Sequence, residues 1–206
     1  ANQKLERLAT IDELTGVLNR RGFEAALHRE LGNALRSGAN LAVCLVDCDD
    51  FKHINDTYGH GVGDIVLRDL AKRIESSLRS SETIGRIGGD EFLVLLPGVR
   101  MAEALLVAER LRLAVSEGTT VATLGPLDVS ISVGVATLPR DARSIEEILS
   151  LTRLALKKSK LAGKNRVSAS DAELSMDDIV QALIAGDSLT LVAQPVVRLS
   201  DFGVVG

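Results

Sequence analysis

The sequence contains no tryptophan, and aromatic residues make up only 2% of it: four phenylalanines and one tyrosine. Proteins that bind single-stranded nucleic acid usually stack bases on aromatic side chains, and nucleic-acid binders in general need a basic surface. Here the formal net charge is −4 and the isoelectric point is about 5.5. The composition therefore argues against nucleic acid as a partner. An acidic protein still binds phosphates where metal ions or a few lysines neutralise them locally.

Cysteine is also scarce, with only Cys44 and Cys48, four residues apart in a segment that reads as a strand. An extended chain holds their Cα atoms too far apart for a disulfide, so a reducing, cytoplasmic compartment is expected. No apolar run approaches the length of a membrane span, and no signal peptide is visible, so we expect no membrane contact from this chain. Because it starts at Ala1 without methionine, we expect it to be part of a longer protein that could be membrane-tethered upstream.

What is present is globular in character. The chain has 206 residues, of which 46% are hydrophobic and 25% charged. This composition is typical of a folded domain and differs from that of disordered chains. The length suits one domain of ordinary size plus a remainder.

Apolar residues recur at helical spacing in four segments. The predicted helices cover about 22–35, 64–79, 101–116 and 145–162. The first is expected to end at Gly38. The last opens with a capping box formed by Ser144 and Glu147 and is expected to end at Gly163.

Strand-like segments lie between these helices. Residues 41–47 are apolar on both faces, as in a central strand, and 83–87 with 92–96 predict a hairpin. Residues 128–137 alternate as a half-buried strand, 166–168 suit a short last strand, and a polar loop is expected over 49–63. The order predicts an α+β fold with a mixed, mainly antiparallel central sheet flanked by helices, not a doubly wound Rossmann sheet.

Carboxylates occur at two strand ends. Asp47 directly follows an apolar strand, and Asp90 with Glu91 falls at the hairpin tip. Acids that converge at one end of a sheet repel each other unless a hard cation such as magnesium lies between them. On spacing alone, a strand-end turn residue and a solvated hairpin tip explain these acids equally well.

Other polar residues also have two readings. Gly88 and Gly89 suit a hairpin turn, but they would also let a triphosphate lie against bare backbone. Lys52 is either a surface lysine or a neighbour of the same phosphates. Asp64 is well placed as a helix cap. Turns and caps also explain the remaining candidates, which are Asn55, Asp56, Gly59, His60 and Gly63.

Taken together, these residues resemble a known family. The stretch VDCDDFKHINDTYGHGVGD, followed after a helix by RIGGDEF, resembles the GGDEF family of diguanylate cyclases. The resemblance covers about residues 10–168, from DELT (12–15) to LAGKNRV (161–167). It implies a nucleotide-cyclase palm-like fold and a magnesium-dependent enzyme that condenses two GTP molecules into cyclic di-GMP. It also implies a homodimer, because each domain holds one GTP.

The resemblance further implies the catalytic and metal-binding roles. Asp47 and Asp90 would bind two Mg²⁺ (or Mn²⁺) ions per active site, with the backbone carbonyl of Cys48 as a third protein ligand. Asp90 would also accept the proton of the attacking hydroxyl, and Glu91 would be a further acid near the metals. Lys52 would stabilise the charge that grows on the phosphates.

Substrate-binding roles follow in the same way. Asn55 and Asp64 would recognise guanine, since a carboxylate can accept from both N1–H and the 2-amino group, which adenine cannot match. His60 would lie near the sugar, and Gly88 and Gly89 would give the triphosphate room. The terminal phosphates would be bound by Lys160 and Lys164.

Some positions depart from the family pattern. Lys164 stands where arginine is common, Lys157 replaces a frequent tyrosine, and Asp50 sits where an apolar residue is common. Many members carry Arg-x-x-Asp before the hairpin, where cyclic di-GMP binds and inhibits. Here the aligned residues are Arg79 and Glu82, and Arg110 would supply a partner contact; an ordinary solvated helix end explains the same pattern.

The resemblance divides the chain into four parts. We expect the end of an upstream signalling helix at 1–10, the GGDEF domain at 11–169, a linker at 170–177, and the start of an EAL phosphodiesterase domain at 178–206. The pair Gln194-Pro195 carries the resemblance to the start of an EAL domain. The last part ends before the metal-binding acids of such a domain. Two other functions stay open: a GTP-binding module that regulates an attached phosphodiesterase, and a cyclic di-GMP receptor acting through Arg79.

Overall fold

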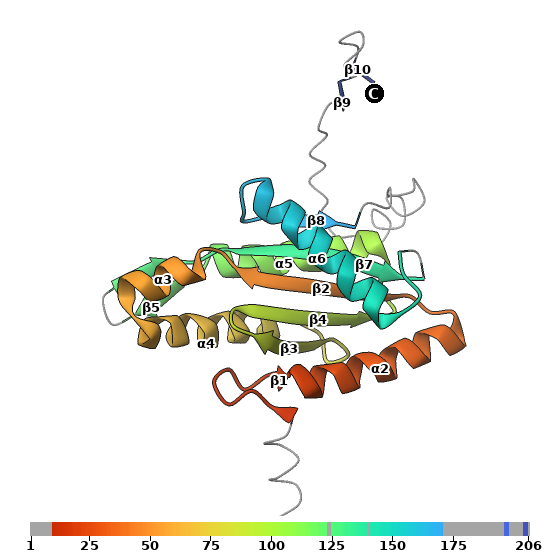
Figure 1. The fold of residues 1–206 in the computed structure, drawn as a ribbon, viewed down its shortest axis with the longest axis horizontal. Coiled ribbons are helices and arrows are strands. Elements are labelled where there is room, and N and C mark those ends of the chain that lie inside the picture. The colour runs from red at the N-terminus through yellow and green to blue at the C-terminus, as the bar shows by residue number, and fades with distance from the viewer. Residues whose placement is uncertain (1–9, 123–124, 140, 171–195, 198–203, 206) are drawn as a thin grey trace, which may run out of the picture.

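The computed structural model describes residues 10–122, 125–139, 141–170, 196–197 and 204–205, and it has a mixed α+β fold (Figure 1). The helices are α2 (Arg20–Ser37), α3 (Phe51–Tyr58), α4 (His60–Ser76), α5 (Met101–Ser116) and α6 (Ile145–Leu161). The main sheet comprises β1 (Leu18–Asn19), β2 (Leu41–Cys48), β3 (Thr83–Gly88), β4 (Glu91–Pro97), β7 (Ile131–Leu138) and β8 (Val167–Ala169). Two separate strand pairs are β5 (Thr119–Ala122) with β6 (Gly125–Asp128), and β9 (Val196–Val197) with β10 (Val204–Val205).

The main sheet has the strand order β1-β3-β4-β2-β7-β8. The inner pairs β3–β4, β4–β2 and β2–β7 are antiparallel, and the outer pairs β1–β3 and β7–β8 are parallel. The prediction of a mixed, mainly antiparallel sheet is confirmed. So is the central position of β2, which hydrogen-bonds to a strand on each side.

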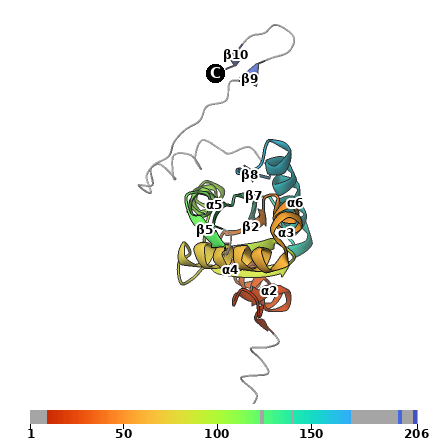
Figure 2. The ribbon, with the colours of Figure 1, turned by 90° about the vertical axis from the view of Figure 1, so that its left-hand side faces the viewer.

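Helices cover both faces of the sheet (Figure 2). Alternate residues of β2 point to opposite faces. Ala42, Cys44 and Val46 belong to the core that packs against α4 and α5. Leu41, Val43 and Leu45 belong to a second core with α2 and α6. The two cysteines are free and buried, as expected.

The hairpin and the helix after it agree closely with the prediction. β3 and β4 pair around Gly89 and Asp90, and α5 spans the residues 101–116 that periodicity indicated. The Ser144 hydroxyl accepts from the Glu147 N–H at 3.1 Å, which is one half of the predicted capping box. The Glu147 carboxylate instead accepts from the N–H of Arg143, at 2.7 Å.

The predicted loop at 49–63 is wrong. Residues 51–58 form α3, and α4 begins at His60. Packing explains the difference, because Ile54 is buried in the core and Phe51 packs against it. Gly59, at φ 83°, turns the chain between the two helices. Asp64 consequently lies inside α4 and is not a helix cap.

The strand prediction at 128–137 also needs correction. β7 begins at Ile131 and is buried on both faces, not half-buried, because it lies between β2 and β8 under α5 and α6. The chain before it pairs as β5 and β6, a hairpin that the sequence did not indicate. Gly134 lets α6 approach β7 closely, since a Cβ there would lie 2.2 Å from the Thr152 carbonyl oxygen.

The terminal predictions lie mostly outside the described residues. These are the upstream helix at 1–10, the linker at 170–177 and the start of an EAL domain at 178–206; of the last, only β9 and β10 are described. Within the described part of the chain, no helix is long and apolar enough to cross a membrane.

Candidate active site

Asp47 and Asp90 lie at the same end of the central sheet. Asp47 is the seventh residue of β2, and it lies opposite Glu91, the first residue of β4. The backbone carbonyl of Asp90, in the turn before β4, accepts a hydrogen bond from the Cys48 N–H at 3.4 Å. The strand end and the hairpin tip therefore meet, with Glu91 beside them.

Negative charge is concentrated at this meeting point. Burial raises the pKa of Asp47, and the charges of Asp90 and Asp49 add to the rise, while Lys160 opposes it through a hydrogen bond and its charge. Burial also raises the pKa of Asp90, and the charge of Glu91 adds to it. Two carboxylates that disfavour each other's ionised form make a site where a cation is stabilised.

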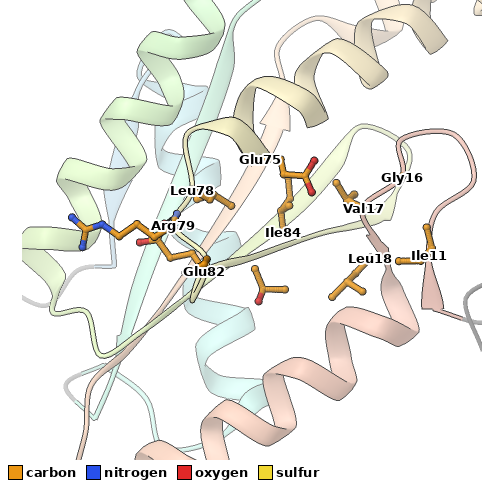
Figure 3. Close-up of a pocket in the computed structure, with 11 residues that line it drawn as sticks. Ile11, Gly16, Val17, Leu18, Glu75, Leu78, Arg79, Glu82 and Ile84 are labelled. Carbon is orange, nitrogen blue, oxygen red and sulfur yellow. Dashed lines mark hydrogen bonds between the residues drawn. The ribbon is translucent and has the colours of Figure 1, made fainter.

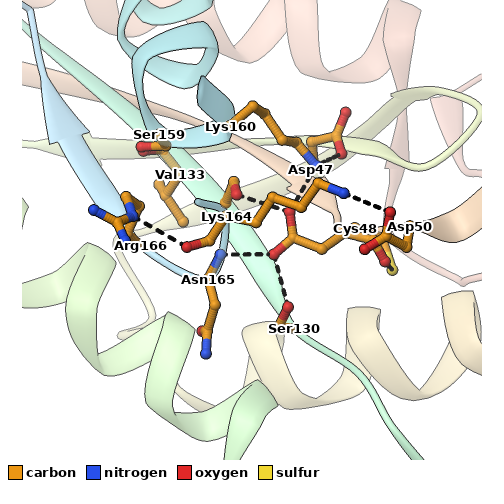
Figure 4. Close-up of polar contacts among 12 residues, drawn as sticks. Asp47, Cys48, Asp50, Ser130, Val133, Ser159, Lys160, Lys164, Asn165 and Arg166 are labelled. Atoms are coloured by element: carbon orange, nitrogen blue, oxygen red, sulfur yellow. Dashed lines mark hydrogen bonds and ion pairs between the residues drawn. The ribbon is translucent and has the colours of Figure 1, made fainter. Parts of the chain in front are cut away.

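Lys160 supplies a positive charge at this site from the end of α6 (Figure 4). Its ammonium donates hydrogen bonds to Asp47 and, at 2.8 Å, to Asp49. Burial alone would lower the pKa of Lys160, but these two carboxylates raise it above its ordinary value, so the side chain stays charged. Lys160 thus contacts a predicted metal ligand.

The donor set fits a hard divalent cation. Asp47, Asp90 and the Cys48 carbonyl offer oxygen atoms, the ligand type that Mg²⁺ prefers. Burial raises the pKa of the Cys48 thiol, so the thiol stays protonated and is not a ligand. Among the described residues, no group of three or more His, Cys, Asp or Glu side chains is arranged to hold a metal ion. A cation here would therefore need water or phosphate ligands as well, which suits magnesium.

Asp49 is a site residue that the sequence analysis missed. Its side chain accepts hydrogen bonds from Ser130, Ser132 and Lys160 and from the backbone N–H of Asn165. Burial alone would raise the pKa of Asp49, but these donors outweigh it and lower the pKa below its ordinary value. The sequence carried no signal for this role, because all four of these partners lie at least 80 residues away along the chain.

The two predicted guanine-binding residues come from adjacent helices. Asn55 lies in α3 and Asp64 in α4. The side-chain oxygen of Asn55 is buried without a hydrogen-bond partner. It lies against Gly63, where an added Cβ would be only 2.0 Å away. A buried acceptor without a partner is costly, so this atom is available to a ligand.

Lys52 and His60 are exposed at the starts of α3 and α4. Lys52 follows Asp47 by five residues, in the first turn of α3. Both residues therefore belong to the α3–α4 segment that also carries Asn55.

Arg86 holds the turn at Gly88 and Gly89 through hydrogen bonds. Arg86 donates to the Gly89 carbonyl from two nitrogens, at 2.9 and 2.7 Å, and pairs with Asp12 at 3.2 Å. Burial alone would raise the pKa of Asp12, but hydrogen bonds from Thr15 and Arg86 outweigh it and lower the pKa. Gly89 has φ 51°, and nothing lies within 4 Å of the place its Cβ would occupy. The DELT segment thus helps to fix a turn with open space beside Gly89.

Lys164 lies in the turn after α6. Its ammonium donates to Asp50 at 2.5 Å, so two of the positions that depart from the family pattern pair with each other. Asp50, Lys164 and Asn165 all have positive φ, at 56°, 60° and 43°. Residues other than glycine rarely adopt this conformation, and where they do so they often belong to functional sites.

The predicted inhibitory residues Arg79 and Glu82 lie around the turn after α4 (Figure 3), at the end of β3 that is remote from the turn at Asp90. A pocket of about 410 Å³ is lined by Arg79 and Glu82, together with Ile11, Leu18 and Ile84. The Glu82 carboxylate accepts from the Arg79 N–H at 2.7 Å, as expected of a solvated turn. Arg110 reaches the same region from α5, donating to the Ser77 carbonyl at 3.0 Å.

Comparison with known proteins agrees with this fold and site. Residues 9–166 match the family described as diguanylate cyclase, GGDEF domain. This chain belongs to that family. The coiled coil and GGDEF domain of DgcB from Caulobacter crescentus, solved in complex with c-di-GMP, superimposes with a TM-score of 0.76 at 30% identity. The superposition covers 82% of this chain and 89% of that one.

Curated relatives include both enzyme classes of this signalling system. The chain is 40% identical over 167 residues to the probable diguanylate cyclase DgcC of Escherichia coli, covering 80% of this chain and 44% of the relative. It is 36% identical over 210 residues to the cyclic di-GMP phosphodiesterase NbdA of Pseudomonas aeruginosa, covering 98% of this chain and 27% of the relative. The chain thus spans a quarter to a half of these relatives' lengths.

Proposed function

We propose that this chain is a diguanylate cyclase, which condenses two GTP molecules into cyclic di-GMP and releases two pyrophosphates. The observation that carries the proposal is the meeting of Asp47 and Asp90 beside a glycine turn with open space at Gly89. Lys160 contacts Asp47 from α6, and Lys164 contacts the nearby Asp50 from the turn after that helix. Family membership supports the reaction, and the acidic motif residues of the family are all present.

The reaction follows from phosphoryl-transfer chemistry. The 3′-hydroxyl oxygen of one GTP forms a bond to the α-phosphorus of the other, and the bond from that phosphorus to pyrophosphate breaks. Asp90 accepts the hydroxyl proton as the general base. Lys52 offsets charge that grows on the phosphates, and Glu91 adds to the acidic environment. Lys160 and Lys164 bind the terminal phosphates.

Divalent cations complete the proposed site. Asp47, Asp90 and the Cys48 carbonyl would hold two Mg²⁺ or Mn²⁺ ions. Such ions lower the pKa of a hydroxyl and neutralise departing phosphate oxygens. The protein's own contribution is to fix the acids at the sheet end and to keep the glycine turn open for the triphosphate.

Guanine selection is proposed for Asn55 and Asp64, with the sugar near His60. We expect Gly63→Ala to weaken GTP binding at least tenfold, because its Cβ would displace the Asn55 amide oxygen. A good bidentate contact to a base contributes about 1–3 kcal/mol of discrimination, which is the source of this magnitude. Titration calorimetry with GTP measures the effect.

Gly61→Ala is the matched control for that variant. It lies in the same helix, and nothing lies within 4 Å of its Cβ position. It should leave GTP affinity within about twofold. Equal affinities of the two variants would contradict the role of Asn55.

A second nucleotide site is proposed at the turn after α4. Arg79, Glu82 and Arg110 would bind cyclic di-GMP as an inhibitor beside the pocket of Figure 3. We expect Arg79→Ala to keep the initial rate and to remove inhibition by added cyclic di-GMP, since Arg79 lies outside the acid cluster. Progress curves with and without added product measure this, and unchanged inhibition would argue against the site.

A regulatory GTP-binding module is the second candidate. The observation that favours it is the match of 98% of this chain to a protein named as a phosphodiesterase.

We also propose a division of the chain into four parts. Residues 1–10 end an upstream helix, 11–169 form the GGDEF domain, 170–177 are a linker, and 178–206 begin an EAL domain.

Incubation of the purified chain with GTP and Mg²⁺ separates the two candidates. A cyclase forms cyclic di-GMP and pyrophosphate, detected by chromatography and mass spectrometry. A binding module binds GTP and forms neither product, even at high protein concentration or when fused to a dimerising helix. The second result would overturn the proposed cyclase activity.

A further inference from the structure

Asp49 is a buried carboxylate with every acceptor position in use. The residue is only 5% exposed, so it has little direct access to substrate. Its Oδ1 atom accepts from Ser132 Oγ at 2.7 Å and Lys160 Nζ at 2.8 Å. Its Oδ2 atom accepts from Ser130 Oγ at 2.7 Å and from the Asn165 N–H at 2.9 Å. Four donors from three segments of the chain therefore converge on one side chain.

Two of these donors belong to the phosphate-binding elements of the proposed site (Figure 4). Lys160 is held between Asp49 and Asp47, so Asp49 is a second anchor for the ammonium. Asn165 follows Lys164, and both residues have positive φ. The bond from Asn165 to Asp49 offsets part of the cost of that conformation and fixes where Lys164 leaves the backbone.

Arg112 contacts the same turn from α5. It donates to the Asn165 side-chain oxygen at 2.7 Å and forms a salt bridge with Glu109 at 2.6 Å within α5. The turn after α6 is therefore fixed through its backbone by Asp49 and through its side chain by Arg112. Rigid support of this kind is what a long, flexible lysine needs to act at a defined point.

We propose that Asp49 is a positioning residue that places Lys160 and Lys164 for the terminal phosphates of GTP. This inference rests on the proposed function, in which these lysines bind those phosphates. Lys160 also contacts Oδ1 of Asp47, and a cation bound at that acid would weaken this contact. Asp49 then keeps the ammonium next to the phosphates. A carboxylate serves here because it accepts from all four donors at once, which an amide cannot do.

Asp49→Asn tests the proposal, because it preserves shape but removes the charge and part of the acceptor capacity. We expect it to weaken binding of a GTP analogue with a methylene bridge between the α- and β-phosphates about tenfold, the range expected for a hydrogen bond to a charged group. Binding of the GDP analogue with the same bridge should fall less than threefold. Both affinities are measured by titration calorimetry, and neither needs turnover.

Asp141→Asn is the matched control. Asp141 is also a carboxylate clamp at β7, accepting from Thr137 and Ser170, but it lies at the far end of that strand. Asp141→Asn should leave the ratio of the affinities for the GTP and GDP analogues unchanged. Equal losses for both analogues in Asp49→Asn, or the same change of ratio in Asp141→Asn, would overturn the positioning role.

Two further variants keep the test decisive. Lys160→Gln should reproduce the selective loss of triphosphate affinity. In the double variant with Asp49→Asn, the loss of binding free energy should be smaller than the sum of the two single losses. Full additivity would contradict the proposal. If Asp49→Asn does not fold, Ser132→Ala replaces it, because it removes one hydrogen bond to Asp49. Ser132→Ala should weaken binding of the triphosphate analogue more than binding of the diphosphate analogue. Equal losses of affinity would count against the proposal. If the wild-type chain makes no cyclic di-GMP but Asp49→Asn shows the selective loss of triphosphate affinity, only the cyclase activity is refuted. If the wild-type chain is active but Asp49→Asn shows no selective loss, only the role of Asp49 is refuted.

Discussion

Replacing Asp90 by alanine is expected to lower the rate of cyclic di-GMP formation at least 10²-fold. Loss of one preorganised transition-state contact costs about 10²- to 10³-fold in other enzymes. Asp90 combines two proposed roles, as metal ligand and as proton acceptor, in a half-buried position next to Asp47. Initial rates of pyrophosphate release at saturating GTP and Mg²⁺ measure the loss.

The interpretation of that rate depends on a folded variant. Glu24→Ala is a suitable control, because Glu24 is an exposed acid on α2, and its rate should stay within about twofold of the wild type. Asp90→Ala should keep its guanine affinity, since Asn55 and Asp64 lie on other elements. A folded Asp90→Ala chain that retains more than a tenth of the wild-type rate would refute the assigned role.

The rate per molecule is expected to fall in proportion to protein concentration once the domains are mostly monomeric. Each domain is proposed to hold one GTP, and the product is two-fold symmetric, so two domains must face each other. A hundredfold dilution below the dissociation constant of the dimer should therefore lower the specific activity about a hundredfold, by mass action. Rates from micromolar to nanomolar protein, paired with light scattering, measure this.

A fused dimerising helix provides the control for dilution. The fusion should keep its specific activity across the same range, because its domains remain paired. A constant specific activity of the unfused chain, with scattering that shows monomers, would contradict the paired mechanism.

The sequence predicted the elements whose signals are local. The hairpin at 83–96 was readable because two apolar runs flank glycines, and α5 because its apolar spacing is regular. The loop prediction at 49–63 failed because α3 is short and polar, and it depends on burying Ile54 against distant elements. β7 was read as half-buried because Ser132 and Thr137 are polar, yet both are buried and hydrogen-bonded to acids.

The candidate site likewise has residues that sequence motifs predicted and one residue that depends on long-range contacts. Family motifs identified Asp47, Asp90 and Lys160 from sequence, and these residues lie together at one sheet end. The role of Asp49 was not readable, because Ser132 and Asn165 lie 83 and 116 residues further along the chain. Contacts that span such separations exist only once the sheet and α6 have packed. The EAL assignment and the roles of single site residues stay predictions.

The most direct test of the central claim is the anomalous scattering of Mn²⁺ in crystals grown with the α,β-methylene GTP analogue. We expect an anomalous peak between the carboxylates of Asp47 and Asp90, next to the analogue's phosphates, with the Lys160 ammonium moved from Asp47 to those phosphates. Manganese bound elsewhere, or an analogue bound away from the glycine turn while these two acids hold no metal, would contradict it.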